Sequence, residues 1–469
     1  MLKTALLLAG SSGVVSAMRF GRNVLLARLI GVEDYGIAST FALIMALVEM
    51  LSDLGLGRFV VHDREGDNPG FVAAIQALEI LRGAVLATLV FAFADPVAAF
   101  FGHPGLGWAY RIVAVMPLLI AMVHLDIMRQ QRAMRFGLMV KADFAGQAAS
   151  LAALWPLGLW LGDFRVMIGV MIVESLARIG TTHFLAERPY RISWDGAVVI
   201  RALRFGWPLL AGGMLTFAVM QGERLIVANQ FTAIDLGLFS AALTLAMSPT
   251  LVAQRVINSM FLPLLARERD NELGFLRKAE LSLETLLAGG LGLMLLYVLA
   301  GPGALRLAYG AEFAAGGQLA AILGITFSLR MVRSAPTNIS IAKGRTINLL
   351  IANTVRLVSF PVGYMIALRG GSVEAIALTG LAGEAASLLI AYLLVALREG
   401  LGPVLARRAP TYGIALVLAL LLVAMAAGLT AGPLPAIAAV LLFLVVLALS
   451  ARLRGYLATE LRRRRKGLP

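Results

Sequence analysis

The sequence of 469 residues has no cysteine, little charge and few aromatic side chains. Without cysteine, a disulfide framework, a zinc–thiolate site and a thiol nucleophile are all excluded. The four histidines are dispersed and lack the spacing of metal ligands. The Gly-x-x-x-x-Gly-Lys-[Ser/Thr] loop that cradles nucleotide phosphates is also missing. We therefore predict that the chain is not an enzyme and uses no metal, no cofactor and no ATP hydrolysis of its own.

Long apolar segments dominate what is present. Hydrophobic residues make up 59% of the chain and charged residues only 14%, whereas soluble domains are about one-quarter charged. A helix needs about 20 apolar residues to cross a bilayer. The sequence predicts an all-α integral membrane protein with about fourteen transmembrane helices, at 5–28, 36–60, 70–94, 107–128, 137–160, 165–186, 206–230, 237–264, 280–300, 318–340, 347–368, 374–397, 412–430 and 433–451. The loops between them are too short for a folded extramembrane domain.

The basic residues lie mainly in alternate loops and in the tail at 452–469. Because Lys and Arg accumulate on the cytoplasmic side, we expect both termini in the cytoplasm of a multi-pass protein of the bacterial inner membrane. The same bias explains the net charge of +14. Anionic phospholipid is the expected contact of the basic tail, and nucleic acid is not an expected partner.

One block of sequence occurs twice. Ala27, Asp34, Gly36 and Ser39 recur at Ala228, Asp235, Gly237 and Ser240. Each block joins two predicted helices through an Asp-x-Gly turn. We therefore predict two parallel six-helix lobes at 1–204 and 205–400, followed by an appended helix pair with a basic tail at 401–469. Parallel repeats of this kind are typical of transporters, with the substrate path at the repeat interface.

The opening helices carry a resemblance to a known family. The run from Arg22 to Gly36 followed by residues 51–57, the segment 96–104, and Phe205-Gly-Trp-Pro208 resemble bacterial polysaccharide (O-antigen type) flippases. These belong to the multidrug/oligosaccharidyl-lipid/polysaccharide exporter superfamily. The resemblance implies transfer of an undecaprenyl-pyrophosphate-linked oligosaccharide from the cytoplasmic to the periplasmic leaflet, with polysaccharide polymerase and export machinery as further partners. Arg58 departs from the small or polar residue usual in relatives.

Ionisable residues inside the predicted spans are the main functional signal, because an arginine facing lipid costs about 2.5–3.5 kcal/mol at a helix centre. Glu79 and Arg82, and Glu174 and Arg178, are spaced to neutralise each other on one helix face. Arg58, Arg330 and Arg333 are placed to snorkel to the cytoplasmic surface. Asp53 and Arg255 occupy equivalent repeat positions and could pair between lobes, as an inner gate or a buried structural bridge. The gating or coupling candidates are Asp53, Arg255, Glu223, Glu79 and Arg82.

The candidate substrate-binding residues are arginines. Arg19 and Arg22 lie deep on the first span without an acid on that helix, and Arg22 corresponds to Glu223, beside Arg224. In the family the helices that carry them face each other, so Arg19, Arg22 and Arg224 are the first candidates for binding pyrophosphate through guanidinium forks. Arg330, Arg333 and Arg356 are the next candidates. His124 and Asp126 could relay protons or form an interhelical hydrogen bond.

These features predict a flippase that works by alternating access, with a basic central cavity, driven by an ion gradient or the membrane potential. A small-molecule or multidrug exporter of the same superfamily is the alternative, although cationic drugs would favour an acidic cavity. A membrane glycosyltransferase or ligase is a second alternative, but it would need a larger loop for its catalytic residue.

Overall fold

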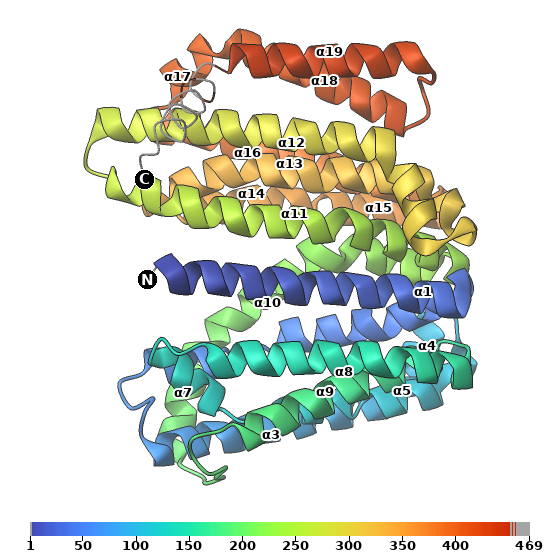
Figure 1. The fold of residues 1–469 in the computed structure, drawn as a ribbon, viewed down its shortest axis with the longest axis vertical. Coiled ribbons are helices and arrows are strands. Elements are labelled where there is room, and N and C mark those ends of the chain that lie inside the picture. Colours follow the sequence, from blue (N-terminus) through green and yellow to red (C-terminus); the bar gives the residue numbers. More distant parts are fainter. Residues whose placement is uncertain (1, 451–452, 454, 456–469) are drawn as a thin grey trace. The chain divides into compact units, whose positions relative to one another are not determined.

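The structure is a computed structural model. It describes the backbone of residues 2–450, 453 and 455, and the side chains of 13–450 (except 51, 211 and 255), 453 and 455. The side chain of Arg255 and most of the predicted basic tail thus lie outside the described residues. Within that part of the chain the regular structure is helical, with no strand. Figure 1 shows the helices as two compact units, residues 1–240 and 241–469.

The helices of unit 1 are α1 (Leu2–Ser52), α2 (Leu56–His62), α3 (Pro69–Ala92), α4 (Ala94–Phe100), η1 (Pro104–Leu106), α5 (Gly107–Val113), α6 (Met116–Ala121), α7 (Asp126–Arg132), α8 (Gly137–Leu161), α9 (Arg165–Phe184) and α10 (Gly196–Gln230). The helices that follow are α11 (Ala233–Arg267), α12 (Glu272–Tyr309), η2 (Ala311–Gly316), α13 (Gly317–Ala342), α14 (Ile347–Leu357), α15 (Ser359–Leu368), α16 (Val373–Arg398), α17 (Gly402–Arg407), α18 (Ala409–Ala426) and α19 (Pro433–Leu449). The boundary between the units falls inside α11. The lobe limits 1–204, 205–400 and 401–469 stay a prediction.

Eleven helices of the described chain are long and apolar enough to cross a membrane. The predicted count of about fourteen is not confirmed, and the differences are local. The first two predicted spans fall largely within the single helix α1, which is kinked at Gly31. Helix α9 is not among the eleven, and α19 is a shorter apolar helix.

Helix α1 is a hairpin of two helical segments. Gly31 has φ 79° and ψ 175°, a backbone conformation that glycine adopts without steric cost. Along α10, a Cβ on Gly206 would meet Leu54, and a Cβ on Gly213 would meet Met50. Further on, Arg224 reaches the carbonyl of Ser39. The second segment of α1, which begins after the turn at Gly31, therefore runs antiparallel to α10.

The two copies of the repeated block pack against each other within unit 1. A Cβ on Gly36 would lie 1.8 Å from the carbonyl oxygen of Ala233, and one on Gly237 would lie 2.2 Å from that of Val32. Val32 and Ala233 occupy equivalent positions in the repeat, as do the two glycines. The contact is thus reciprocal, and it explains why both copies need glycine: the two backbones touch there.

We expect Gly36→Ala to destabilise the protein by about 1–3 kcal/mol, because the added methyl group cannot be accommodated without separating the two backbones. Gly21→Ala, on the same helix, is the matched control, since a Cβ there meets no atom within 4 Å. Thermal unfolding of the purified variants measures the difference. Equal midpoints for the two variants would show that the close approach is absent.

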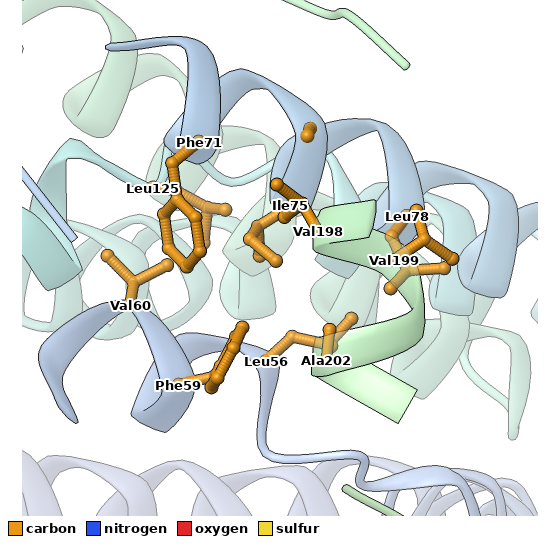
Figure 2. Packing of buried hydrophobic residues seen from close by; sticks show 11 residues of the cluster. Leu56, Phe59, Val60, Phe71, Ile75, Leu78, Leu125, Val198, Val199 and Ala202 are labelled. Atoms are coloured by element: carbon orange, nitrogen blue, oxygen red, sulfur yellow. The ribbon is translucent and has the colours of Figure 1, made fainter. Parts of the chain in front are cut away.

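An apolar cluster joins helices at one end of unit 1. Figure 2 shows it between α2, α3 and the first turns of α10. Its buried members are Leu56, Phe59, Val60, Phe71, Ala74, Ile75, Leu78, Leu125, Val198, Val199 and Ala202. Burying each large side chain contributes about 1.5–3 kcal/mol. The cluster packs these helices together at one end of unit 1.

Unit 2 is built around α13. Most side chains of this helix are buried, and it packs between α12 and α16. Helix α18 contacts α12, and the Arg408 guanidinium pairs with the buried carboxylates of Glu280 (2.9 Å) and Glu284 (3.3 Å). These ion pairs attach the C-terminal helix pair to the rest of unit 2.

Candidate functional site

The most deeply buried charged group of unit 2 consists of Arg330 and Arg333 of α13, Arg356 of α14 and Glu384 of α16, here called the arginine cluster. The Glu384 carboxylate accepts hydrogen bonds from Arg333 Nε at 2.7 Å and Arg330 Nε at 3.3 Å. Arg356 Nη1 lies 3.1 Å from the same carboxylate. Glu384 is fully buried, and the residue exposure of the arginines is 1–9%. One carboxylate is therefore shared by three guanidinium groups inside the unit.

The local sequence explains why these groups meet. Arg330 and Arg333 are three residues apart, which places them on the same face of α13. Gly383 lets α16 approach α14 and α15 closely, because a Cβ there would lie 2.7 Å from Ser359 Cβ and 3.2 Å from the carbonyl oxygen of Arg356. The residue after this glycine is Glu384. Close approach of the helices thus brings the carboxylate beside Arg356.

Further contacts fix the orientation of the guanidinium groups. Arg333 Nη1 donates to Asn353 Oδ1 at 3.0 Å, and the Arg330 guanidinium lies 4.5 Å from the centre of the Phe327 ring. The prediction that Arg330 and Arg333 snorkel to the surface is wrong, because both are buried beside Glu384. The four residues of the cluster carry two more positive than negative charges. Three guanidinium forks in one place make the cluster suited to an anion.

In unit 1 the ion pairs of the charged residues differ from the predicted ones. Arg22 of α1 forms an ion pair with Glu174 of α9, and Gln147 of α8 donates to the same carboxylate at 2.5 Å. Arg178 pairs with Asp143 at 3.2 Å. The predicted pairing of Glu174 with Arg178 is therefore wrong, because helix packing offers each residue a partner on another helix. The first predicted span, 5–28, contains no acid, and the partner of Arg22 comes from α9.

The pair Glu79–Arg82 is confirmed, with an Arg82 Nη2–Glu79 Oε2 distance of 2.7 Å. Arg82 also donates to the backbone carbonyl and the hydroxyl of Ser52. Glu49 lies within electrostatic reach of Arg19 and Arg82. Across α1, α3, α8 and α9, the four arginines at 19, 22, 82 and 178 thus accompany four carboxylates, at 49, 79, 143 and 174. Each of these arginines thus has a carboxylate nearby.

Arg224 differs from the other arginines of unit 1. Its hydrogen-bond partners are neutral oxygen atoms, the Ser39 carbonyl at 3.2 Å and the Ser240 hydroxyl at 3.1 Å. Arg22 lies nine residues before Gly31, and Ser39, which Arg224 contacts, lies eight residues after it. Arg22 and Arg224 therefore lie at a similar distance from the turn of the hairpin. Arg22 is part of α1 and Arg224 contacts the same helix, whereas the side chain of Arg19 is exposed. Glu223 is half-buried on α10. Binding of pyrophosphate by Arg19, Arg22 and Arg224 stays a prediction.

Asp53 has a partner within its own unit. It pairs with Arg58, and both side chains are more than half exposed. Arg58, which departs from the family pattern, thus neutralises the carboxylate at the end of α1. Because the side chain of Arg255 lies outside the described residues, the predicted pair Asp53–Arg255 stays a prediction.

We expect a double-mutant cycle with Arg22→Ala and Glu174→Ala to give a coupling energy of about 1–3 kcal/mol, as found for residues in direct contact. Unfolding of the purified protein measures it. The same cycle with Arg178→Ala and Glu174→Ala is the control, and its coupling should be below about 0.5 kcal/mol. The reverse order of the two couplings would support the pairing within α9 instead.

Sequence reasoning named the three arginines of the cluster but not Glu384 as a site residue. The signal was present, since Glu384 is an acid in the middle of an apolar helix, where an uncompensated charge is costly. What the sequence could not show is that three arginines from two other helices converge on it. Asn353 was missed because an asparagine within an apolar segment has no distinctive spacing.

Comparisons with known proteins place these features in context. The family described as "Polysaccharide biosynthesis protein" matches residues 25–316. The succinoglycan biosynthesis transport protein ExoT of Rhizobium meliloti is 22% identical, over 52% of this chain and 50% of that protein. The lipopolysaccharide biosynthesis protein WzxC of Escherichia coli is also 22% identical, again over 52% of this chain and 50% of that protein. The chain spans about half the length of the curated relatives it matches.

Two solved structures share the fold. The lipid II flippase MurJ, in an inward closed conformation, has a TM-score of 0.71 at 13% identity and covers 98% of this chain and 100% of its own. An inward-facing multidrug resistance MATE family transporter of the MOP superfamily has a TM-score of 0.65 at 14% identity, covering 82% and 94%. The prediction of an all-α, multi-pass membrane protein with a transporter fold is confirmed.

Proposed function

The chain belongs to the polysaccharide biosynthesis protein family, and from that premise we propose that it is a flippase for an undecaprenyl-pyrophosphate-linked oligosaccharide. It moves this lipid from the cytoplasmic to the periplasmic leaflet of the bacterial inner membrane by alternating access. The similarity to a succinoglycan transport protein and to a lipopolysaccharide biosynthesis protein supports a polysaccharide precursor as substrate. The likeness to a lipid II flippase concerns the fold alone.

The observation that carries the proposal is the convergence of three guanidinium groups in the arginine cluster. A pyrophosphate bridge in a lipid-linked sugar carries one negative charge on each phosphate, and the cluster has two guanidinium charges beyond that of Glu384. Guanidinium forks bind phosphate oxygens in pairs. The diphosphate thus matches the cluster in charge as well as in hydrogen-bonding geometry. A cationic drug would be repelled by the same charges, which disfavours a multidrug exporter.

Glu384 then acts as the resident counter-ion of the empty site. Three guanidinium groups buried together without a carboxylate would repel one another strongly. When the substrate binds, its phosphates take over part of this neutralisation. Because the cluster is buried, the helices α13, α14 and α16 must move apart to admit the diphosphate, as alternating access requires.

The same charge offers a way to couple transport to the membrane potential. A charge that crosses the whole potential exchanges about 2.3 kcal/mol per 100 mV. With substrate bound, the cluster is neutral, and after release it is cationic. An inside-negative potential therefore favours return of the empty site toward the cytoplasm. In proteoliposomes, collapse of the potential with valinomycin and potassium should slow repeated turnover but not the first transfer.

The test of the function is a cell that lacks the gene. We expect it to lose its surface polysaccharide and to accumulate the lipid-linked oligosaccharide in the cytoplasmic leaflet, where an added periplasmic ligase or glycosidase cannot reach it. Restoring the wild-type gene should reverse both effects. An unchanged surface polysaccharide with no accumulated lipid-linked intermediate would overturn the proposal.

A further inference from the structure

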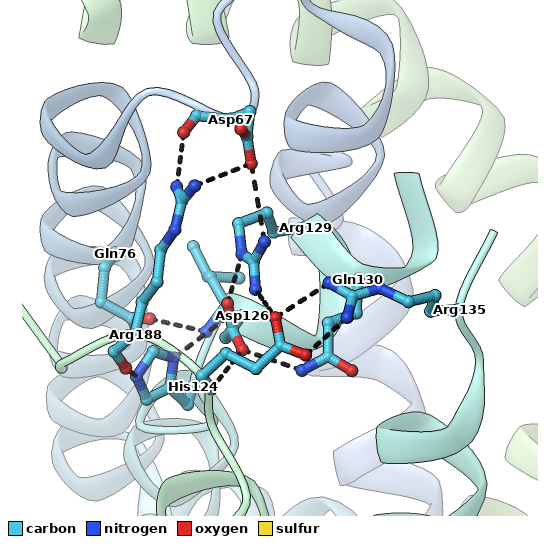
Figure 3. Close-up of polar contacts among 10 residues, drawn as sticks. Asp67, Gln76, His124, Asp126, Arg129, Gln130, Arg135 and Arg188 are labelled. Carbon is cyan, nitrogen blue, oxygen red and sulfur yellow. Dashed lines mark hydrogen bonds and ion pairs between the residues drawn. The ribbon is translucent and has the colours of Figure 1, made fainter. Parts of the chain in front are cut away.

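A partly open cavity of about 220 Å³ lies at the loop end of unit 1, between the start of α3, the segment before α7 and the loop after α9. We call it the loop-end pocket. Its polar lining includes Gln76, His124, Asp126, Arg129, Arg188 and Arg191, with the ring of Tyr190. Figure 3 shows Arg129 directed toward Asp126, His124 beside the Arg188 backbone, and the Arg188 side chain extending to Asp67. By the distribution of basic loops, this end is the predicted cytoplasmic side.

Asp126 holds the pocket together. Its buried carboxylate accepts hydrogen bonds from Arg129 Nε at 2.5 Å, Gln130 Nε2 at 2.9 Å and the Glu187 backbone N–H at 2.9 Å. Burial alone would raise the pKa of Asp126, but these hydrogen bonds outweigh it and hold the pKa below its usual value. The carboxylate is therefore charged at neutral pH, and it fixes Arg129 in a single orientation.

His124 connects the two loops that form the pocket. Its Nδ1 accepts a hydrogen bond from the Asp126 backbone N–H at 3.0 Å, and its Nε2 lies 3.0 Å from the Arg188 carbonyl oxygen. Since Nδ1 is the acceptor, Nε2 carries the proton. His124 and Arg188 both lie outside helices, so this bond joins two loops and is not the interhelical hydrogen bond that the sequence allowed. Both nitrogens are engaged in holding the loops, and a proton relay finds no support in the contacts.

One polar group at the pocket lacks a partner within the described residues. The Tyr190 ring packs against His124 and His183, with ring centres 5.3 and 4.7 Å apart, and its hydroxyl is buried without a hydrogen bond. By contrast, Gln76 uses both ends of its amide, toward the Ala121 carbonyl and the Leu125 N–H. A buried hydroxyl without a partner beside a cavity indicates a ligand or water that completes it.

The charge around the cavity favours an anion. Arg129, Arg188 and Arg191 line it together with Asp126. Arg129 is neutralised by Asp126 and by Glu187 at 2.5 Å, so the charge available to a ligand is that of Arg188 and Arg191. Arg191 forms no hydrogen bond or ion pair within the described part of the chain and is exposed. Arg188 is tied to Asp67 at 3.1 Å, but the Asp67 side chain is 66% exposed, and such surface pairs contribute only about 0–1 kcal/mol. Arg188 also donates to the Asp67 backbone carbonyl. The Arg191 guanidinium can therefore turn to a ligand directly, and that of Arg188 does so by giving up its two contacts with Asp67.

We propose that the loop-end pocket binds a phosphate group. The donors are the forks of Arg188 and Arg191 and the Tyr190 hydroxyl, on a floor fixed by Asp126. The cavity exceeds the roughly 30 Å³ share of one water molecule several times, so it accommodates a phosphate with part of an ester attached. The phosphate comes either from an anionic phospholipid of the adjacent leaflet or from a soluble phosphate. This site is separate from the arginine cluster, and it does not depend on the proposed function.

Purified protein in detergent provides the test. In native mass spectrometry, we expect phosphatidylglycerol to remain bound at least tenfold more than phosphatidylcholine if the phosphate is that of an anionic lipid. The soluble source is tested by adding inorganic phosphate or glycerol 3-phosphate and measuring the rise in the unfolding temperature of the protein. The double variant Arg188→Gln, Arg191→Gln should lower the binding at least tenfold. Arg201→Gln, an exposed arginine of the same unit that does not line the pocket, should leave it unchanged.

Tyr190→Phe keeps the aromatic packing and removes only the hydroxyl, so it tests the site even if the double variant is poorly folded. We expect it to weaken binding about threefold to tenfold. Three outcomes would each overturn the proposal: none of the probes bind, wild type and double variant bind equally, or Arg201→Gln lowers binding as much as the double variant.

Discussion

We expect Arg333→Ala to abolish export of the polysaccharide precursor while the protein stays in the membrane at its normal level. In the proposed function, this guanidinium would supply charge-assisted hydrogen bonds to the diphosphate, each worth about 1.5–3 kcal/mol. Losing two of them lowers the transport rate by roughly 100-fold or more, since 1.4 kcal/mol corresponds to about tenfold. The fold tolerates the change because Glu384 keeps two other arginines, and repulsion among the guanidinium groups falls.

The measurement is surface polysaccharide together with membrane abundance of the variant. Arg333→Lys keeps the charge but loses the planar fork, and we expect about tenfold lower export from it. Arg369→Ala, an exposed arginine of the same unit, is the matched control and should export normally. Normal export by a well-expressed Arg333→Ala variant would remove the arginine cluster from the substrate path.

Unlike Arg333→Ala, Glu384→Ala should unfold the protein. The substitution leaves the guanidinium groups of Arg330, Arg333 and Arg356 buried without their shared carboxylate. Breaking a buried ion pair by removing one partner costs about 3–5 kcal/mol, a large part of the stability of a typical fold. We expect strong loss of protein from the membrane and a lowered unfolding temperature in detergent.

Two further variants separate charge from packing at this position. Glu384→Gln keeps the shape but not the charge, so it should also destabilise the protein. Combining it with Arg356→Gln removes one of the uncompensated cations and should recover part of the lost stability. If Glu384→Ala accumulated and unfolded like the wild type, the carboxylate would not be the counter-ion of the arginines.

The helices could be predicted from the sequence because burial in a bilayer leaves a local signature of apolar segments. Helix α9 shows the limit of that signature. Glu174 and Arg178 lower its hydropathy, although it packs against α1, α6 and α8 like a membrane-spanning helix. The repeat was visible as Gly36 and Gly237, but only the structure gives the reason. Each glycine faces the backbone of the other copy, and sequence alone does not show which chain segments cross.

Local spacing was an incomplete guide to ion pairs. It sufficed for Glu79 and Arg82, which lie on one helix face, but it failed for Glu174 and Arg178, which pair with residues of other helices. The partner of Arg22 is Glu174, 152 positions away in sequence, and depends on how α1 packs against α9. The cost of burying charge in a membrane indicated that Arg330, Arg333 and Arg356 need compensation. It could not indicate that one carboxylate on α16 serves all three and leaves positive charge in excess.

The most direct test of the account is the preference of the purified protein for a diphosphate. In proteoliposomes, the transfer rate of an undecaprenyl-pyrophosphate-linked oligosaccharide is compared with that of the same glycan linked through a single phosphate. We predict that the wild type prefers the diphosphate at least tenfold and that Arg333→Lys loses most of this preference. Equal rates for the two lipids, or a preference unchanged in Arg333→Lys, would contradict the assignment of the arginine cluster as the diphosphate site.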